Sequence, residues 1–230
     1  MKNLVQQIIN WINKTDEHMV IGISGHGAAG KTTFAQDLVN GVNQKGVNYI
    51  NTDPYLVSSN VRKHAIIEYT YHNERHQFKV TACHPAAHNL GALERDIQMV
   101  REKLDFNTIH TSYLKSKLIS SKNKVTIVEG MTVAFINPDL FDLTIYLYAD
   151  GETELRRRSS RDIVERGADL AYLKRSHEER RIQYEVFMHP YSERFDIIVK
   201  NDDQSIVLEK NNLKNTPHVN RREACGKKLF

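Results

Sequence analysis

The sequence predicts an α/β fold in which helices cover both faces of a parallel β-sheet. Two observations support this expectation. First, short apolar segments with the length of strands recur along the chain, at residues 19–24, 47–51, 125–128, 143–148 and 195–199. Strands of a parallel sheet are buried on both faces, so they appear as continuous apolar runs. Second, segments with helical spacing of apolar residues separate most of these strands, as parallel connections require.

The helices follow from the same spacing, taken in order along the chain. They are expected at residues 1–14, 31–42, 90–104, 152–165 and 170–188. The first helix is amphipathic and lacks the apolar block of a signal peptide. No later apolar run reaches the length that spans a bilayer, so we expect no membrane association.

The length and order of these elements predict one domain over residues 1–200. Residues 57–87 have no regular period and are rich in His, Tyr and Asn, so an insertion with a hairpin or short helices is expected there. The two charged helices within residues 152–188 would form a lid. The chain turns polar after Asn201, and residues 201–230 are expected to form a polar C-terminal tail.

The composition is that of a globular domain with a modest basic excess. The 230 residues include 32 lysines and arginines and 28 aspartates and glutamates, which gives a formal net charge of +4. This excess suits a small anionic ligand, but it is too small and too dispersed to indicate nucleic-acid binding. Cys83 and Cys225 are the only cysteines and have no CxxC partner, which argues against a disulfide framework and suggests the reducing cytoplasm.

A glycine-rich segment, residues 25–32 (GHGAAGKT), matches the pattern G-x-x-x-x-G-K-[ST] between a predicted strand and a predicted helix. In such a loop, backbone N–H groups and the positive end of the helix attract phosphate oxygens. Lys31 would reach the β and γ phosphates of ATP or GTP, and the Thr32 hydroxyl would bind Mg²⁺. The alternative is a turn with a chance Lys-Thr pair, which the flanking strand and helix disfavour. The candidate nucleotide-binding residues are Gly25, His26, Gly27, Ala28, Ala29, Gly30, Lys31, Thr32 and Thr33.

Two acidic residues follow predicted strands, where ligands of such sheets bind. Asp53 comes after residues 47–51, and Pro54 stops the chain from continuing into sheet or helix. Asp53 could therefore accept the proton of an attacking hydroxyl, or it could simply form an Asp-Pro turn. Glu129 closes the strand at residues 125–128 before Gly130. It could orient Mg²⁺ or its bound waters, or it could cap a helix.

Arginines are concentrated in the first predicted lid helix and directly after it, at Arg156, Arg157, Arg158, Arg161 and Arg166. Arginines on a lid can pair with phosphoryl oxygens and exclude the water that would hydrolyse the nucleotide. We expect this catalytic role for Arg161 and Arg166. Arg156 and one neighbour fit better on a solvated helix with acidic partners.

The segments GHGAAGKTT, TDPY, CHPAAHN, LDF, VTIVEG and RDIVERGADL occur in this order and resemble the uridine kinase and phosphoribulokinase-like family of P-loop kinases. The resemblance covers roughly residues 19–200. It implies a three-layer P-loop NTPase fold of the nucleoside-kinase type, with helices on both faces of the sheet and a helical arginine lid. It also implies that Asp53 is the catalytic base and that the protein can form a homo-oligomer.

The same resemblance places several residues on the substrate side. Phe106 stands where uridine kinases carry an aromatic residue that stacks on the base, although a core phenylalanine is the alternative. The further substrate-side candidates are Tyr55, His84, His110 and Arg166. Two departures concern this pocket: Cys83 replaces the usual acidic residue before His84-Pro85, and Asp53-Pro54-Tyr55 replaces the usual D-S-F-Y. Loss of the carboxylate puts uridine itself in question.

The sequence therefore predicts a kinase that transfers the γ-phosphate of ATP or GTP to a hydroxyl of a small molecule such as uridine or cytidine. A sugar phosphate or other metabolite is an alternative acceptor, and a non-catalytic nucleotide-dependent switch is an alternative function. A nucleic-acid partner is not expected, because no basic or aromatic track for a strand is evident. Pro85 argues against a helix that would bring His84 and His88 together on zinc.

Overall fold

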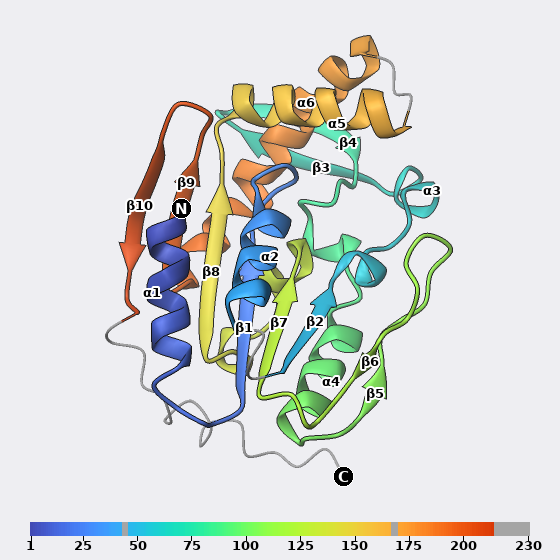
Figure 1. Cartoon of the computed structure of the whole chain (residues 1–230). Coiled ribbons are helices and arrows are strands. Elements are labelled where there is room, and N and C mark those ends of the chain that lie inside the picture. Colours follow the sequence, from blue (N-terminus) through green and yellow to red (C-terminus); the bar gives the residue numbers. More distant parts are fainter. Residues whose placement is uncertain (43–45, 167–169, 214–230) are drawn as a thin grey trace.

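The structure is a computed structural model that describes residues 1–42, 46–166 and 170–213; at residues 161–166, 170–173 and 175 it describes the backbone alone. Within these ranges the central sheet has six strands in the order β10-β9-β8-β1-β7-β2 (Figure 1). The strands are β1 (Met19–Ser24), β2 (Val47–Asn51), β7 (Val125–Glu129), β8 (Leu143–Tyr148), β9 (Ile197–Asn201) and β10 (Ile206–Asn211). All neighbouring pairs are parallel except β9 with β10. The predicted α/β fold with a mainly parallel sheet is confirmed.

Helices cover both faces of this sheet. On one face, α1 (Lys2–Ile12) and α2 (Lys31–Val42) bury their apolar sides against β1, β7, β8 and β9 in one core cluster (Figure 1). On the other face, α4 (Leu90–Arg101) and the end of α6 (Leu170–Phe187) join short 3₁₀ turns in a second cluster. Because both faces are covered, β1 and β7 are buried along their whole length.

The carboxyl ends of the parallel strands lie beneath a group of smaller elements. Helix α5 (Gly151–Arg166) packs against α6, and the two are called the lid helices below (Figure 1). Beside them lie α3 (Ser59–Arg62) and a hairpin of β3 (Ile66–Tyr71) and β4 (Glu74–Lys79). The hairpin is fastened to α6, because the Tyr69 hydroxyl donates to Glu179 at 2.7 Å. The end of the sheet that binds ligands in such folds is therefore the end that the lid helices cover.

Short turns and a second hairpin complete the described chain. The 3₁₀ turns are η2 (Asp53–Tyr55), η3 (Pro85–Ala87), η4 (Met131–Phe135), η5 (Pro138–Leu140) and η6 (His189–Arg194). The second hairpin pairs β5 (Phe106–Asn107) with β6 (Leu118–Ile119). None of the helices described here combines the length and apolar character needed to cross a membrane.

One boundary expected from the sequence needs correction. The chain does not become a tail at residue 201, because residues 206–211 form β10 and extend the sheet. Its apolar residues Ile206, Val207 and Leu208 are exposed by 50, 46 and 44 %. Backbone hydrogen bonds to β9 hold this edge strand in the sheet. Its side chains are largely exposed, so its sequence lacks the pattern of a buried strand. The rest of the expected tail, residues 214–230, lies outside the described residues.

Candidate active site

The glycine-rich loop joins β1 to α2, as its motif predicts, and its backbone depends on glycine. Gly25 has φ 137°, and a Cβ atom there would lie 1.7 Å from the carbonyl oxygen of Leu147 on β8. Only glycine permits this close approach without displacing the loop. The far side of the loop is held as well, since the Asn201 side chain donates to the Ala29 carbonyl at 2.9 Å. The loop is thus fixed between β8 and the end of β9.

Lys31 is folded back against this loop. Its side chain is 9 % exposed, and its Nζ donates to the carbonyl oxygen of His26 at 2.8 Å. The ammonium group therefore lies at the centre of the loop, where a lysine can reach phosphate groups cradled by backbone N–H groups. The His26 ring, in contrast, is fully buried and turned toward Ala149 at the end of β8. The His26 ring therefore points away from the exposed side of the loop.

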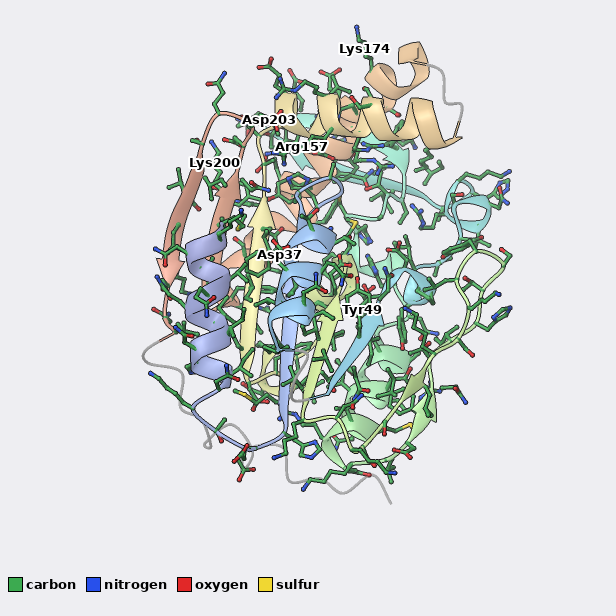
Figure 2. The ribbon with its side chains drawn as sticks, viewed as in Figure 1. Asp37, Tyr49, Arg157, Lys174, Lys200 and Asp203 are labelled. Atoms are coloured by element: carbon green, nitrogen blue, oxygen red, sulfur yellow. The ribbon has the colours of Figure 1, made fainter. Side chains whose placement is uncertain are left out.

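A cluster of oxygen atoms lies next to the loop. Glu129 at the end of β7 is 3 % exposed, and its Oε2 accepts hydrogen bonds from the Thr32 hydroxyl at 3.3 Å and from the Tyr49 hydroxyl at 2.8 Å. Burial and the charge of Glu129 raise the pKa of Tyr49. Tyr49 lies on β2 (Figure 2), so it remains a neutral donor to this carboxylate.

The donor set of this cluster fits Mg²⁺. A hydroxyl and a carboxylate are the hard oxygen ligands that Mg²⁺ takes, and the ion is usually held by one or two protein groups together with substrate phosphates. Among the described residues, no group of three or more His, Cys, Asp or Glu side chains could by itself hold a metal ion. Thr32 and Glu129 are therefore suited to a metal that also binds a nucleotide.

Asp53 lies at the same end of the sheet as Glu129. The two strands that precede them, β2 and β7, pair in register from Val47↔Val125 to Asn51↔Glu129, and the Thr52 amide donates to the Glu129 carbonyl at 2.8 Å. Gly130 makes this contact possible, because a Cβ at its φ of 145° would lie 1.9 Å from the Thr52 hydroxyl oxygen. Asp53 follows on η2 and is exposed. Its carboxylate is accessible beside the oxygen cluster.

The lid helices reach the loop through Arg157 and Arg158. Arg157 donates from Nη1 to the Ala28 carbonyl at 3.3 Å and from Nε to Asp203 at 2.8 Å, in the turn between β9 and β10 (Figure 2). Asp203 also pairs with Arg156. Arg158 is 5 % exposed and lies 3.8 Å from Glu154. Arg161 and Arg166, the two arginines expected to act in catalysis, belong to α5, but their side chains lie outside the described residues.

The substrate-side candidates whose side chains the structure describes lie in different surroundings. Tyr55 is 1 % exposed, and its hydroxyl donates to Asp96 on α4. The prediction that Tyr55 contacts substrate is therefore wrong for this arrangement: the η2 turn aims the ring into the core. Phe106 is half-buried and packs against the second core cluster, which fits the alternative of a core phenylalanine. His110 is exposed in the loop between β5 and β6.

His84 lies near the lid helices, half-buried beside Phe187 at 4.5 Å between ring centroids. Its Nδ1 accepts from the Ala86 amide at 3.1 Å, and burial lowers the pKa of the ring. The preceding Cys83 is 2 % exposed, and burial raises the pKa of its thiol to about 11. At this position the protein therefore carries a neutral thiol.

Two arginines that sequence reasoning missed lie close to Cys83. Arg62 donates to the carbonyls of Val57 at 2.8 Å and Val80 at 3.2 Å, and burial together with the charge of Arg180 lowers the pKa of Arg62. Arg180, on α6, interacts electrostatically with Cys83, and its Nε is buried without a hydrogen-bond partner among the described residues. We call Arg62 and Arg180 the basic pair. Among the side chains that the structure describes, no carboxylate forms an ion pair with either arginine.

No local pattern could have identified this pair. Arg62 belongs to a stretch without periodicity, and Arg180 is one of several arginines on a charged helix. Only the fold brings α3 and α6 together, through the stretch from Val80 to Cys83. In that stretch the Thr81 amide donates a hydrogen bond to Oε1 of Gln183 on α6 at 2.9 Å.

Comparison with known proteins agrees with this geometry. A model of the Phosphoribulokinase / Uridine kinase family matches residues 20–207. The chain is 26 % identical over 202 residues to the chloroplastic phosphoribulokinase of Arabidopsis thaliana, covering 82 % of the chain and 51 % of that protein. It is 27 % identical over 200 residues to the uridine kinase of Lactobacillus helveticus, covering 82 % and 89 %. The chain thus spans about half the length of the plant phosphoribulokinase.

A solved structure has the same fold. Phosphoribulokinase from Rhodobacter spheroides superposes with a TM-score of 0.57 at 15 % identity, covering 81 % of this chain and 71 % of that one. The likeness at this level of identity concerns the fold.

Proposed function

Because the chain belongs to the phosphoribulokinase and uridine kinase family of P-loop kinases, we propose that it transfers the γ-phosphate of ATP or GTP to a hydroxyl group of a small molecule, with Mg²⁺. The observation that carries the proposal is the placement of Lys31, the Thr32–Glu129 pair and an exposed Asp53 at one end of the sheet. Each supplies a different requirement of phosphoryl transfer.

The donor side of the reaction belongs to the loop. Its backbone N–H groups and the first turn of α2 hold the β and γ phosphates, and Lys31 exchanges its contact with the His26 carbonyl for phosphate oxygens. Thr32 and Glu129 would hold Mg²⁺, which would offset the negative charge of the phosphates. Tyr49 keeps the Glu129 carboxylate oriented toward Thr32 by its hydrogen bond.

The acceptor side belongs to Asp53. An exposed carboxylate at the end of β2 can hydrogen-bond the acceptor hydroxyl, orient its oxygen toward phosphorus and take its proton. The lid helices would exclude water from the transferring group, with Arg161 and Arg166 adding positive charge.

The acceptor is proposed to carry an anionic group of its own. Two guanidinium groups near one another, with no carboxylate partner among the side chains that the structure describes, repel each other and favour a ligand with negative charge. The neutral Cys83 thiol beside them adds no charge to balance the pair. This arrangement favours a sugar phosphate or similar metabolite over an uncharged nucleoside such as uridine. A carboxylate at residue 83 would suit the sugar hydroxyls of a nucleoside better than the Cys83 thiol does.

An acceptor screen tests the proposal. Purified protein with Mg²⁺ and either ATP or GTP is incubated with uridine, cytidine, pantothenate and a set of pentose and hexose phosphates, and the labelled product is separated from nucleotide. Product from a phosphorylated acceptor supports the proposed class, while product from uridine alone supports the nucleoside alternative. Nucleotide binding without product from any acceptor would favour a nucleotide-dependent switch.

A further inference from the structure

The ring of His26 connects the phosphate-binding loop to the end of β8. Its Nε2 lies 2.8 Å from the Ala149 amide nitrogen and 3.0 Å from the Ala149 carbonyl oxygen. Arg181 of α6 already donates to that carbonyl at 3.0 Å, whereas Nε2 is the described partner of the amide. Nε2 is therefore the acceptor, and the proton resides on Nδ1, which donates to the Gly27 carbonyl at 2.8 Å.

On its other side the ring meets Glu154 in the first turn of α5. Nδ1 lies 3.5 Å from Glu154 Oε2, and both side chains are buried, with 0 and 2 % exposed. The same carboxylate lies 3.8 Å from Arg158 of α5 and 3.5 Å from Arg181 of α6. One buried carboxylate thus joins the loop to both lid helices.

Neighbouring groups fix the ring in this position. Tyr184 of α6 is fully buried and packs edge-on against the imidazole, with 4.7 Å between centroids. Burial lowers the pKa of His26, so the ring is neutral at neutral pH even though Glu154 opposes this shift. A neutral ring with a fixed tautomer has a single set of partners, so a displacement of the Gly27 carbonyl would move the ring relative to Glu154.

Glu154 is also a neighbour of Arg158, which lies one helical turn further along α5. A Cβ built on Gly27 would be 3.9 Å from Arg158 Cδ, so this arginine runs over the loop. The stabilisation that a guanidinium gives to a phosphoryl transition state depends on how accurately the group is placed. The Glu154 carboxylate contacts both Arg158 and Arg181. The position of the Arg158 guanidinium is therefore linked to the packing of α6 against α5.

We propose that His26 and Glu154 are positioning residues that couple occupation of the phosphate-binding loop to the arrangement of the lid helices. The proposal rests on the proposed kinase function, because it assigns these residues to the closing of the same site. When phosphates draw the loop amides inward, the His26–Glu154 contact carries the change to α5 and α6. Neither side chain touches the nucleotide.

Hydrogen exchange of the intact protein with and without Mg-ADP tests this coupling. In the wild type, the nucleotide is expected to slow exchange in the loop and in both lid helices. In Glu154→Gln, which preserves shape but removes the charge, protection of the loop persists and protection of α5 and α6 is lost. The Kd for Mg-ADP changes less than about threefold while kcat falls about 10- to 100-fold, as expected when placement rather than contact is disturbed.

His26→Phe keeps the ring volume without the nitrogens and should behave in the same way, whereas His26→Gln, whose amide can accept from Ala149, should restore part of the coupling. Glu185→Gln is the matched control. It removes the other ion pair of Arg181, at 2.7 Å, without touching His26, and should keep the wild-type response.

The possible results separate the two proposals. If folded Glu154→Gln shows the wild-type protection of the lid helices, the coupling is overturned and the kinase proposal stays intact. The same conclusion follows if Glu185→Gln loses as much protection of the lid helices as Glu154→Gln. If the wild-type protein binds no Mg-ADP, both proposals fall.

Discussion

The hydroxyl of Thr32 lies 3.3 Å from a carboxylate oxygen of Glu129, although the two residues are 97 positions apart in the chain. The sheet explains their meeting. β1 pairs with β7, so the turn that follows β1 and the residue that closes β7 reach the same edge. A parallel sheet gathers strand-end residues in this way, and it makes the pair a suitable place for Mg²⁺.

Glu129→Gln should therefore raise the Mg²⁺ concentration that gives half-maximal activity, by about 10- to 100-fold. The amide keeps the shape and can still accept from Thr32 and Tyr49, but it lacks the charge that attracts the cation. Activity titrated with Mg²⁺ at saturating nucleotide measures the shift. Tyr49→Phe, which leaves the charge and removes one hydrogen bond, should shift the titration less. An unchanged Mg²⁺ titration in Glu129→Gln would contradict the metal-side role.

Lys31→Met should lower kcat by about 10²- to 10³-fold, the usual effect of removing one charged group aimed at the transition state. The methionine chain fills nearly the same space, and the variant loses the hydrogen bond to the His26 carbonyl. Single-turnover rates with a confirmed acceptor provide the measurement. Lys122→Met, an exposed site between β6 and β7, is the control and should keep the wild-type rate. Equal rates in the two variants would refute the assignment of Lys31.

The positions of the donor-side candidates can be predicted from the sequence because their determinants are local. The loop motif directly follows one apolar strand, each acid lies at or just after the end of another, and burial imposes the apolar pattern on the strands. The structure keeps Lys31, Thr32 and Glu129 where these patterns place them.

The acceptor side depends on contacts between distant segments, and there the sequence is less informative. Tyr55 follows Asp53 closely, yet the 3₁₀ turn directs its ring to Asp96 on α4. The basic pair joins α3 to α6, and His26 meets Glu154 only because the lid packs on the end of β8. None of these residues has a periodicity or spacing that marks its partner.

Asp53→Asn should reduce kcat by about 10²- to 10⁴-fold while leaving the Kd for nucleotide unchanged. The amide cannot take the proton from the acceptor hydroxyl, but it can still form the turn after β2. Equilibrium binding of Mg-ATP and the rate of product formation give the two values. Asp37→Asn on α2 is the control because that exposed acid lies outside the proposed site. Undiminished turnover in Asp53→Asn would rule out its role as the base.

Arg180→Met should raise the KM for a phosphorylated acceptor by about 10- to 100-fold, corresponding to one lost charged hydrogen bond. Its effect on kcat should be small, because the proposed contact is with a group that does not react. Arg180 is the better choice than Arg62, which also holds two backbone carbonyls.

Arg75→Met provides a matched control for Arg180→Met, since Arg75 is exposed on β4 of the neighbouring hairpin. Its KM should equal that of the wild type. If Arg180→Met also retains the wild-type KM, the basic pair does not bind the acceptor, and an uncharged nucleoside becomes the better acceptor class.

The stability of the protein should fall on acidification because His88 is buried in its neutral form. Its Nε2 donates to the Ala82 carbonyl at 2.9 Å, and Nδ1 lies 2.9 Å from the Thr132 hydroxyl. Burial lowers the pKa of His88 to about 4, and the charge of Arg62 acts in the same direction. In the unfolded chain the ring titrates near 6.5, so below that pH the unfolded state binds more protons than the folded state.

The contribution of His88 is therefore complete above pH 6.5 and is lost as the pH falls toward 4, where the loss reaches about 3 kcal/mol. Urea denaturation at pH 7, 6, 5 and 4 measures this dependence. His88→Gln should flatten it by about one proton, and the remaining slope should include His26, whose pKa burial also lowers. If His88→Gln keeps the full pH dependence of the wild type, another group is responsible for the acid sensitivity.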